Sequence, residues 1–212
     1  MLKNREIEYK YRTCLSLTKF KERINKFDDF LNYSLEIFGN DIFYEHSDRK
    51  DTFVRLRTSE NESTLTAKKK INLEQNNIDR YEVNYNINVD SSEKEKDLLH
   101  LINIPNNRDQ FETFLIDHIK VNGFKEQFTL FKYIIIYQFK DVCLSWYKVF
   151  DKDLKSLDTF IEIEANEGYY SRSEAIMLLD HWEEKLATAG IININMFMND
   201  SLYEIYKKRL TR

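Results

Sequence analysis

Charged and apolar side chains alternate one for one in several separate segments of this chain. Residues 5–12 read Arg-Glu-Ile-Glu-Tyr-Lys-Tyr-Arg, and residues 158–164 read Asp-Thr-Phe-Ile-Glu-Ile-Glu. Because successive side chains of a β-strand point to opposite faces, each segment would present one charged face and one apolar face. The pattern predicts antiparallel strands that bury one face and turn the other toward a polar environment.

Two of these segments place pairs of carboxylates on one strand face. Glu6 and Glu8 share a face near the start of the chain, and Glu162 and Glu164 share a face near its end. Carboxylates are rarely buried without a partner, and two such strands across one polar cavity would repel each other unless a cation lay between them. Hard divalent cations prefer oxygen ligands. We therefore predict a site for Mg²⁺ or Mn²⁺ whose ligands are Glu6, Glu8, Glu162 and Glu164.

Basic residues occur at the same spacing in the middle of the chain. Arg55 and Arg57 share one strand face, and further strand-like segments carry basic residues in the same rhythm. One such alternation alone is more typical of the solvated face of an antiparallel sheet. The joint pattern, acidic at both ends and basic between, instead favours a barrel whose charged faces line one cavity. Guanidinium and ammonium groups bind phosphate oxygens, and metal ions neutralise the remaining charge. The predicted substrate-binding residues are Arg55, Arg57, Lys68, Arg80 and Lys132.

The ordered set of motifs resembles the CYTH family, also called the triphosphate tunnel metalloenzymes, over nearly the whole chain. The motifs are a Glu-x-Glu-x-Lys that ends at Lys10, the Arg-x-Arg pair, an Arg-x-Glu that ends at Glu82, a Gly-Phe turn at Gly123 and a Phe-x-Glu-x-Glu that begins at Phe160. A late Ser-x-Tyr-Glu at 201–204 is similar to a further family motif. The resemblance implies the α+β class, with an antiparallel β-barrel (a tunnel) and helices packed outside it.

Two positions depart from the family pattern. Ile134 stands where the family usually has a second basic residue, and Ser145 stands where it usually has an aspartate that helps to hold metal. The segment that follows Ser145 is also longer than usual. Three carboxylates in it are candidate substitutes for the missing ligand: Asp151, Asp153 and Asp158.

The resemblance implies an enzyme that acts on a triphosphate, since the family includes class IV adenylyl cyclases, thiamine triphosphatases, inorganic triphosphatases and some RNA triphosphatases. Hydrolysis of inorganic triphosphate, thiamine triphosphate or a nucleoside triphosphate is favoured, because the sequence carries no clear adenine-reading element. Lys10 would clamp the substrate or help to activate the nucleophile, and Glu82 would orient a water or help a second metal. The alternatives are cyclisation of ATP to cyclic AMP and pyrophosphate, and a weakened module that binds nucleotide or polyphosphate without turnover.

Composition limits the partners of the chain. Its 212 residues carry a net charge of −4 with a pI near 5.7, which argues against a general nucleic-acid binder but leaves an RNA 5′-triphosphate end open. The sequence contains no apolar run of transmembrane length, so no membrane partner is expected. Two distant cysteines, Cys14 and Cys143, predict free thiols and a cytoplasmic location. We expect a single domain over 1–212, and a homodimer is left open.

Local patterns predict the order of the elements. Ser16 would cap the first helix, Ser171 or Ser173 would cap a late one, and Gly123 and Gly190 would end two helices. The segment at 196–198 is expected to be a loop, and Asn76–Asn77 a tight turn. Helices are predicted at about 16–31, 93–102, 108–121, 171–189 and 200–209. Strands are predicted at about 4–13, 41–45, 51–58, 62–71, 78–88, 126–139, 141–150 and 158–165.

Overall fold

The computed structural model describes residues 5–27, 31–60, 62–71, 78–107, 114–166 and 171–210. It confirms the predicted α+β class. The strands are β1 (Arg5–Arg12), β2 (Leu31–His46), β3 (Thr52–Ser59), β4 (Ser63–Lys70), β5 (Ile78–Asn86), β6 (Phe124–Phe139), β7 (Val142–Phe150), β8 (Ser156–Ala165) and β9 (Phe197–Met198). The helices are α1 (Leu17–Ile24), α2 (Ser92–Leu101), α3 (Leu115–Val121), α4 (Arg172–Thr188), the short 3₁₀ helix η1 (Ile194–Met196) and α5 (Leu202–Leu210).

The strands form one antiparallel ladder that returns on itself. Their order is β5-β4-β3-β2-β6-β7-β8-β1-β9, and β5 also pairs with β1. A ladder whose first strand pairs with one near its other end has the topology of a closed barrel, which is the predicted arrangement. None of the described helices combines the length and the apolar composition needed to cross a membrane.

The chain divides into two compact units, each assembled from segments that are distant in sequence. The first unit consists of Met1–Phe38, Gln75–Asp79 and Phe131–Ser201, and the second of Gly39–Glu74, Arg80–Leu130 and Leu202–Arg212. The expectation of a single domain over 1–212 stays a prediction.

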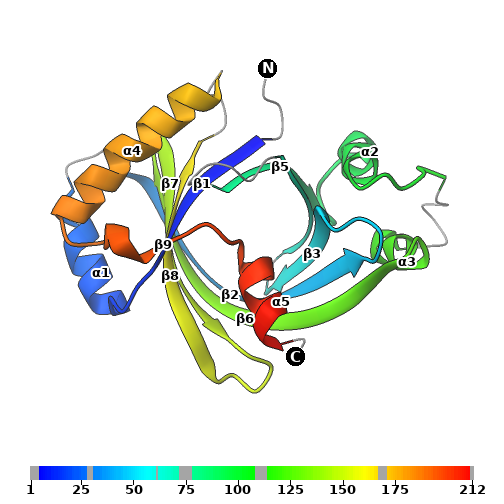
Figure 1. The fold of residues 1–212 in the computed structure, drawn as a ribbon, viewed down its shortest axis with the longest axis horizontal. Helices are drawn as coiled ribbons and strands as arrows, with labels where there is room; N and C mark the ends of the chain where they lie inside the picture. The colour runs from blue at the N-terminus through cyan, green and yellow to red at the C-terminus, as the bar shows by residue number, and fades with distance from the viewer. Residues whose placement is uncertain are drawn as a thin grey trace. The chain divides into compact units, whose positions relative to one another are not determined.

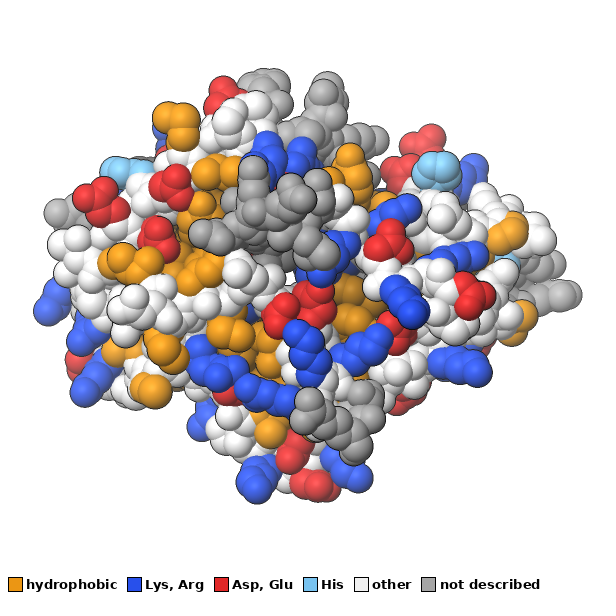
Figure 2. All heavy atoms as spheres, viewed as in Figure 1, with side chains coloured by type: hydrophobic (Ala, Val, Ile, Leu, Met, Phe, Trp, Pro, Cys, Tyr) orange, Lys and Arg blue, Asp and Glu red, His pale blue; other side chains and the backbone are white. Residues whose placement is uncertain are grey.

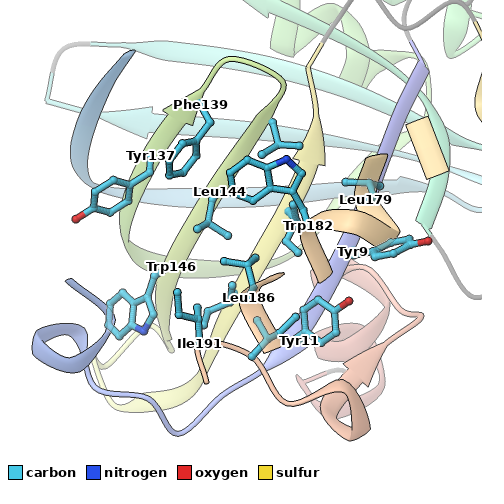
Figure 3. Packing of buried hydrophobic residues seen from close by; sticks show 14 of the residues in the cluster. Tyr9, Tyr11, Tyr137, Phe139, Leu144, Trp146, Leu179, Trp182, Leu186 and Ile191 are labelled. Atoms are coloured by element: carbon cyan, nitrogen blue, oxygen red, sulfur yellow. The ribbon is translucent and has the colours of Figure 1, made fainter. Parts of the chain in front are cut away.

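In the first unit, helices α1 and α4 cover the apolar face of the strands (Figure 1). Odd-numbered residues of β1 and β8 point toward these helices, as the period of two predicts. Figure 3 shows the resulting cluster, in which Trp182 and Leu186 of α4 pack among side chains of β6 and β7. The cluster includes the fully buried residues Tyr11, Phe20, Leu144, Ile161, Ile163, Leu179 and Leu186. Even-numbered residues of β1 and β8 therefore lie on the opposite, charged face.

In the second unit, helices α2 and α3 cover the apolar face of the strands (Figure 1). Val54 of β3 and Leu65 and Ala67 of β4 are fully buried there. They pack in one cluster with helix residues that are also buried, namely Leu98, Leu99, Leu115 and Ile119. The alternate residues of β3, β4 and β5 are consequently the charged ones, on the face away from α2 and α3.

The predicted helix caps at Ser16 and Ser171 and the predicted ends at Gly123 and Gly190 are confirmed. The Ser16 side chain accepts a hydrogen bond from the Lys19 backbone N–H, and the Ser171 side chain accepts one from Glu174. Gly123 and Gly190 have φ values of 96° and 66°, a left-handed conformation that ends the preceding helix at little cost for glycine. Cys14 and Cys143 are both free, as predicted.

Two predicted elements are corrected. The first helix ends at Ile24 rather than near Leu31, and Leu31 begins the long strand β2. The spacing of Phe27 and Leu31 continued the helical period, but the alternating residues that follow suit a strand better. The expected loop at 196–198 contains β9, which pairs with β1 through Phe197 and Met198. The helix predicted at 108–121 begins at Leu115, because Phe114 is its extended N-cap residue. The predicted turn at 76–77 and residues 108–113 lie outside the described residues.

Candidate functional site

One charged face lies in the first unit and is formed by β6, β7, β8 and β1. We call it the carboxylate face. In the antiparallel ladder Glu8 is opposite Glu164 and Lys10 is opposite Glu162, so these four side chains share a face. The members of the carboxylate face are Glu6, Glu8, Lys10, Lys132, Ile134, Cys143, Ser145, Tyr147, Glu162 and Glu164. The structure therefore brings all four predicted metal ligands onto one sheet surface.

Lys10 lies between carboxylates on this face. Its side chain is 3% exposed, and its Nζ is 2.8 Å from Glu8 Oε1 and 3.4 Å from Glu162 Oε2. Two carboxylates from different strands thus share one ammonium group. Within the described ranges, no three His, Cys, Asp or Glu side chains are gathered as a ready metal cage. The donor chemistry of this face nevertheless fits a hard divalent ion, because its acidic side chains supply only oxygen ligands.

The Cys143 thiol reports the negative charge of this face. Cys143 is opposite Glu164 in the ladder between β7 and β8. Burial, together with the charges of Glu164 and Glu162, raises the pKa of the Cys143 thiol to about 12. A second anion beside these glutamates is therefore disfavoured, and a cation is favoured.

The departures from the family pattern fall on this face. Ile134 is buried and points to the same side as Lys132, so an apolar side chain occupies the place of the second basic residue. Ser145 is directly opposite Glu162. Of the three candidate substitutes, Asp158 pairs with Arg12 at 3.2 Å. Asp151 accepts hydrogen bonds from the backbone N–H groups of Asp153 and Lys155 within its own turn, and Asp153 is exposed.

A second charged face lies in the second unit, on β2 to β5 with helix α5 beside it. We call it the cationic face. Arg55 is opposite Thr66, Lys68 is opposite Glu82 and Lys70 is opposite Arg80, so the register places the basic residues of three strands on one side. Its members are Asp41, Phe43, Glu45, Phe53, Arg55, Arg57, Thr66, Lys68, Lys70, Arg80, Glu82, Asn84 and, from α5, Tyr203, Glu204 and Lys207. Four of the five predicted substrate-binding residues are here, and the fifth, Lys132, is on the carboxylate face.

Asp41 fixes the arginine pair of the cationic face. Arg57 donates two hydrogen bonds to Asp41, from Nε at 2.8 Å and from Nη2 at 3.1 Å, and Arg55 Nη1 lies 3.9 Å from the same carboxylate. Asp41 is 1% exposed. Asp41 was not predicted from the sequence, because its strand carries no charge alternation and its contact with Arg57 depends on the register between β2 and β3.

A chain of hydrogen bonds crosses the middle of the cationic face. Arg55 Nη2 donates to Thr66 Oγ1 at 3.1 Å, Thr66 donates to Asn84 at 2.7 Å, and Asn84 donates to Glu82 at 2.6 Å. Glu82 also pairs with Lys68, with 2.5 Å between Oε2 and Nζ. These contacts hold Glu82 beside Lys68.

Helix α5 brings one carboxylate to two cations of this face. Glu204 accepts from Lys70 Nζ at 2.6 Å and from Arg80 Nη2 at 2.8 Å. The Arg80 guanidinium lies 5.6 Å from the centroid of the Phe53 ring, which stacks on Tyr203 of the same helix at 4.6 Å. The Arg80 guanidinium thus contacts both Phe53 and Glu204.

Two guanidinium groups on the cationic face keep an unused donor. Arg80 is 3% exposed, and its Nε, like that of Arg55, is buried without a hydrogen-bond partner in the described part of the chain. A buried donor without an acceptor is costly. Five cations of this face (Arg55, Arg57, Lys68, Lys70, Arg80) contact three carboxylates (Asp41, Glu82, Glu204). A fourth carboxylate, that of Glu45, is matched by Lys207 of α5, so an excess of two positive charges is left. The arrangement suits an added anion with several oxygens.

Comparison with solved structures confirms the predicted fold. The PH1012 protein from Pyrococcus horikoshii matches with a TM-score of 0.63 and 18% identity, over 94% of this chain and 98% of that one. HpAC1 from Hippeastrum, a proposed adenylyl cyclase with a dominant triphosphatase activity, matches with a TM-score of 0.55 and 14% identity, over 96% and 95%. The capping-enzyme triphosphatase of mimivirus matches with a TM-score of 0.50 and 12% identity, over 89% and 90%.

These likenesses bear out the resemblance at the level of the fold. At such identities they do not carry a substrate or a reaction over to this chain. No protein-family model matches the sequence, and a search of curated proteins finds no match.

Proposed function

We propose that this chain is a divalent-metal-dependent triphosphatase. The carboxylate face would hold Mg²⁺ or Mn²⁺ through Glu6, Glu8, Glu162 and Glu164. The cationic face would bind the phosphates through Arg55, Arg57, Lys68 and Arg80, and Lys132 would add a cation beside the metal. The substrate would be inorganic triphosphate, thiamine triphosphate or a nucleoside triphosphate.

The buried guanidinium of Arg80 carries this proposal. It donates to one carboxylate, that of Glu204, while its Nε has no acceptor among the described residues. A phosphate group offers more oxygens than a carboxylate and accepts bidentate hydrogen bonds from arginine. The Glu204 carboxylate supports the proposed binding of phosphate. It is itself an oxyanion, and Lys70 and Arg80 bind it together.

The carboxylate face supports the metal requirement by its chemistry. A divalent ion, when bound, would neutralise phosphate charge and polarise the bond to be cleaved. Lys10 contacts both Glu8 and Glu162, so it would balance the remaining carboxylate charge and donate a hydrogen bond to substrate. Glu82 would keep Lys68 in place for the same substrate.

The proposed reaction is attack of water on the terminal phosphorus. A new P–O bond forms to the water oxygen, the bridging P–O bond breaks, and diphosphate or a diphosphate ester leaves while a proton is released. Little covalent chemistry is required of the protein, so positioning and charge neutralisation supply most of the acceleration.

A catalytically weakened binding module is the second candidate. Ile134 and Ser145 favour it, because they remove one cation and one carboxylate from the carboxylate face. Cyclisation to cyclic AMP and pyrophosphate stays an alternative reaction of the same groups. An extended nucleic-acid surface is less well supported, because Lys and Arg side chains are interspersed with Asp and Glu on the face shown in Figure 2.

A substrate panel tests the proposal. Inorganic triphosphate, thiamine triphosphate, ATP and a 5′-triphosphate RNA would be incubated with Mg²⁺ or Mn²⁺, and phosphate, pyrophosphate and cyclic AMP measured. The proposal expects metal-dependent release of phosphate from at least one triphosphate. Cyclic AMP with pyrophosphate would indicate the cyclase. Binding of triphosphate without any product over hours would indicate the binding module.

A further inference from the structure

Tyr147 of β7 contacts a predicted metal ligand that is not its neighbour in the chain. Its hydroxyl donates a hydrogen bond of 2.7 Å to Glu162 Oε2 on β8. Lys10 Nζ approaches the same oxygen at 3.4 Å. The phenol therefore holds one oxygen of the carboxylate from the side of β7, while the ammonium reaches it from β1.

The ring of Tyr147 is itself held in place. It is 3% exposed and packs on Phe160 with 5.4 Å between ring centroids. Lys132 Nζ lies 5.4 Å from the centroid of the Tyr147 ring. The hydroxyl is thus carried on a side chain with little freedom to turn, so the hydrogen bond also restricts Glu162.

We propose that Tyr147 is a positioning residue that orients Glu162 toward the divalent ion, an inference that rests on the proposed function. The residue directly opposite Glu162 is Ser145, whose side chain is short. Tyr147 is the next residue of β7 on the same face, and its hydroxyl is the group that donates to Glu162. A neutral donor fixes the carboxylate without taking its charge, so Glu162 keeps its attraction for a cation. Mutation of groups that hydrogen-bond to metal ligands in this way typically lowers metal affinity by roughly tenfold to a hundredfold.

Tyr147→Phe isolates the hydroxyl, because phenylalanine keeps the ring that contacts Phe160 and Lys132. Binding of Mn²⁺ to the purified protein would be measured by electron paramagnetic resonance of the free ion, without substrate. We expect the Mn²⁺ dissociation constant to rise on the order of tenfold. The Mn²⁺ concentration that gives half-maximal triphosphatase activity should rise by a similar factor, with a smaller change in kcat at saturating metal.

Tyr9→Phe is the matched control. The Tyr9 hydroxyl also donates to a carboxylate, Asp180 of α4, at 2.6 Å, but on the apolar face of β1. This variant should bind Mn²⁺ like the wild type. Equal Mn²⁺ affinity in Tyr147→Phe and the wild type, or an equal loss in both variants, would overturn the role of Tyr147.

The two proposals fail in different ways. If the wild type binds Mn²⁺, Tyr147→Phe weakens that binding and no triphosphate is hydrolysed, the positioning role stands and the triphosphatase does not. If the wild type binds no Mn²⁺, both are wrong.

Discussion

The charged faces of the two units are built on the same plan with opposite charge. In the first unit, α1 and α4 cover one side of the strands, and the other side gathers carboxylates around Lys10. In the second unit, α2 and α3 cover one side, and the other side gathers arginines and lysines around a few carboxylates. Side chains alternate between the two sides of every strand, and this alternation produces both charged faces. The sign of the charge on each face depends only on which residues occupy the alternate positions.

The two faces also differ in how their charges are shared. On the carboxylate face one ammonium, that of Lys10, serves Glu8 and Glu162. On the cationic face one carboxylate serves two cations, as Glu204 does for Lys70 and Arg80. Each face therefore has an excess of its own sign, and the excesses are complementary to a metal ion and to a polyphosphate. The following changes test this comparison.

The largest effect is expected from Glu162→Gln combined with Glu164→Gln. Amides are weaker metal ligands than carboxylates, so this variant should lose several kcal/mol of transition-state stabilisation. Metal-dependent turnover should therefore fall roughly a hundredfold or more. Turnover would be followed by phosphate release in Mg²⁺ and Mn²⁺. The exposed pair Glu60→Gln and Glu62→Gln, with the same spacing, is the control and should change nothing. Unchanged turnover in the first variant would remove the carboxylate face from the mechanism.

Asp79→Asn should affect stability rather than metal binding. Asp79 of the first unit accepts from Arg5 Nε at 2.6 Å and from Arg172 Nε at 2.7 Å. Breaking this buried cluster should cost about 3 kcal/mol of unfolding free energy, measured by urea denaturation at pH 7. Asp79→Asn should keep the Mn²⁺ affinity of the wild type, because the Asp79 carboxylate is already matched by two arginines. Substitutions of glutamates on the carboxylate face should lower that affinity.

The same cluster predicts a pH dependence. Burial alone would raise the pKa of Asp79, but hydrogen bonds and charge from Arg5 and Arg172 lower it overall. The contribution of Asp79 to the free energy of unfolding is therefore fully present above the pKa of an unfolded aspartate, about 3.9. It is lost as the pH falls through the lowered pKa of the folded state. The acid side of the stability curve should be flatter in Asp79→Asn than in the wild type. An identical acid-side slope of unfolding free energy against pH in the wild type and Asp79→Asn would show that Asp79 does not determine this slope.

Arg57→Ala tests the cationic face. To avoid leaving the buried Asp41 charge without its bidentate partner, the variant would be combined with Asp41→Asn. Charge-assisted hydrogen bonds are worth roughly 1.5–3 kcal/mol, so triphosphate binding should weaken by about tenfold to a hundredfold, measured by calorimetry. Lys120→Ala, on the exposed side of α3, serves as the control. Equal affinity in all three proteins would leave the arginine pair as a structural feature of the strand.

The smallest effect concerns the two thiols. The pKa of Cys143, about 12, keeps it protonated at neutral pH, and its side chain is half-buried, whereas Cys14 is exposed. Iodoacetamide at pH 7.5 should therefore alkylate Cys14 well before Cys143, as mass spectrometry of the peptides would show. Glu164→Gln should speed the modification of Cys143 slightly, because it removes one neighbouring negative charge. Faster alkylation of Cys143 than of Cys14 would contradict the charge assigned to the carboxylate face.

Strand faces were predictable from the sequence, whereas the partners across strands were not. Alternation placed Glu8 and Glu162 on charged faces, and the ladder then brought Lys10 opposite Glu162. By contrast, the bonds from Arg57 to Asp41 and from Tyr147 to Glu162 depend on register, which a short sequence pattern does not specify. The exposed side chains of Tyr33, Leu35 and Phe38 also hid the first half of β2, since apolar residues there do not mark a buried face.

The proposed function requires that a metal ion held through Glu162 and Glu164 strengthens the binding of triphosphate. Its direct test is the affinity of a methylene-bridged triphosphate, which resists hydrolysis, measured by calorimetry with and without Mn²⁺. In the wild type Mn²⁺ should strengthen binding by about tenfold, a typical coupling between two ligands. In Glu162→Gln with Glu164→Gln this gain should vanish while metal-free binding is kept. The same Mn²⁺ gain in both proteins would contradict the account.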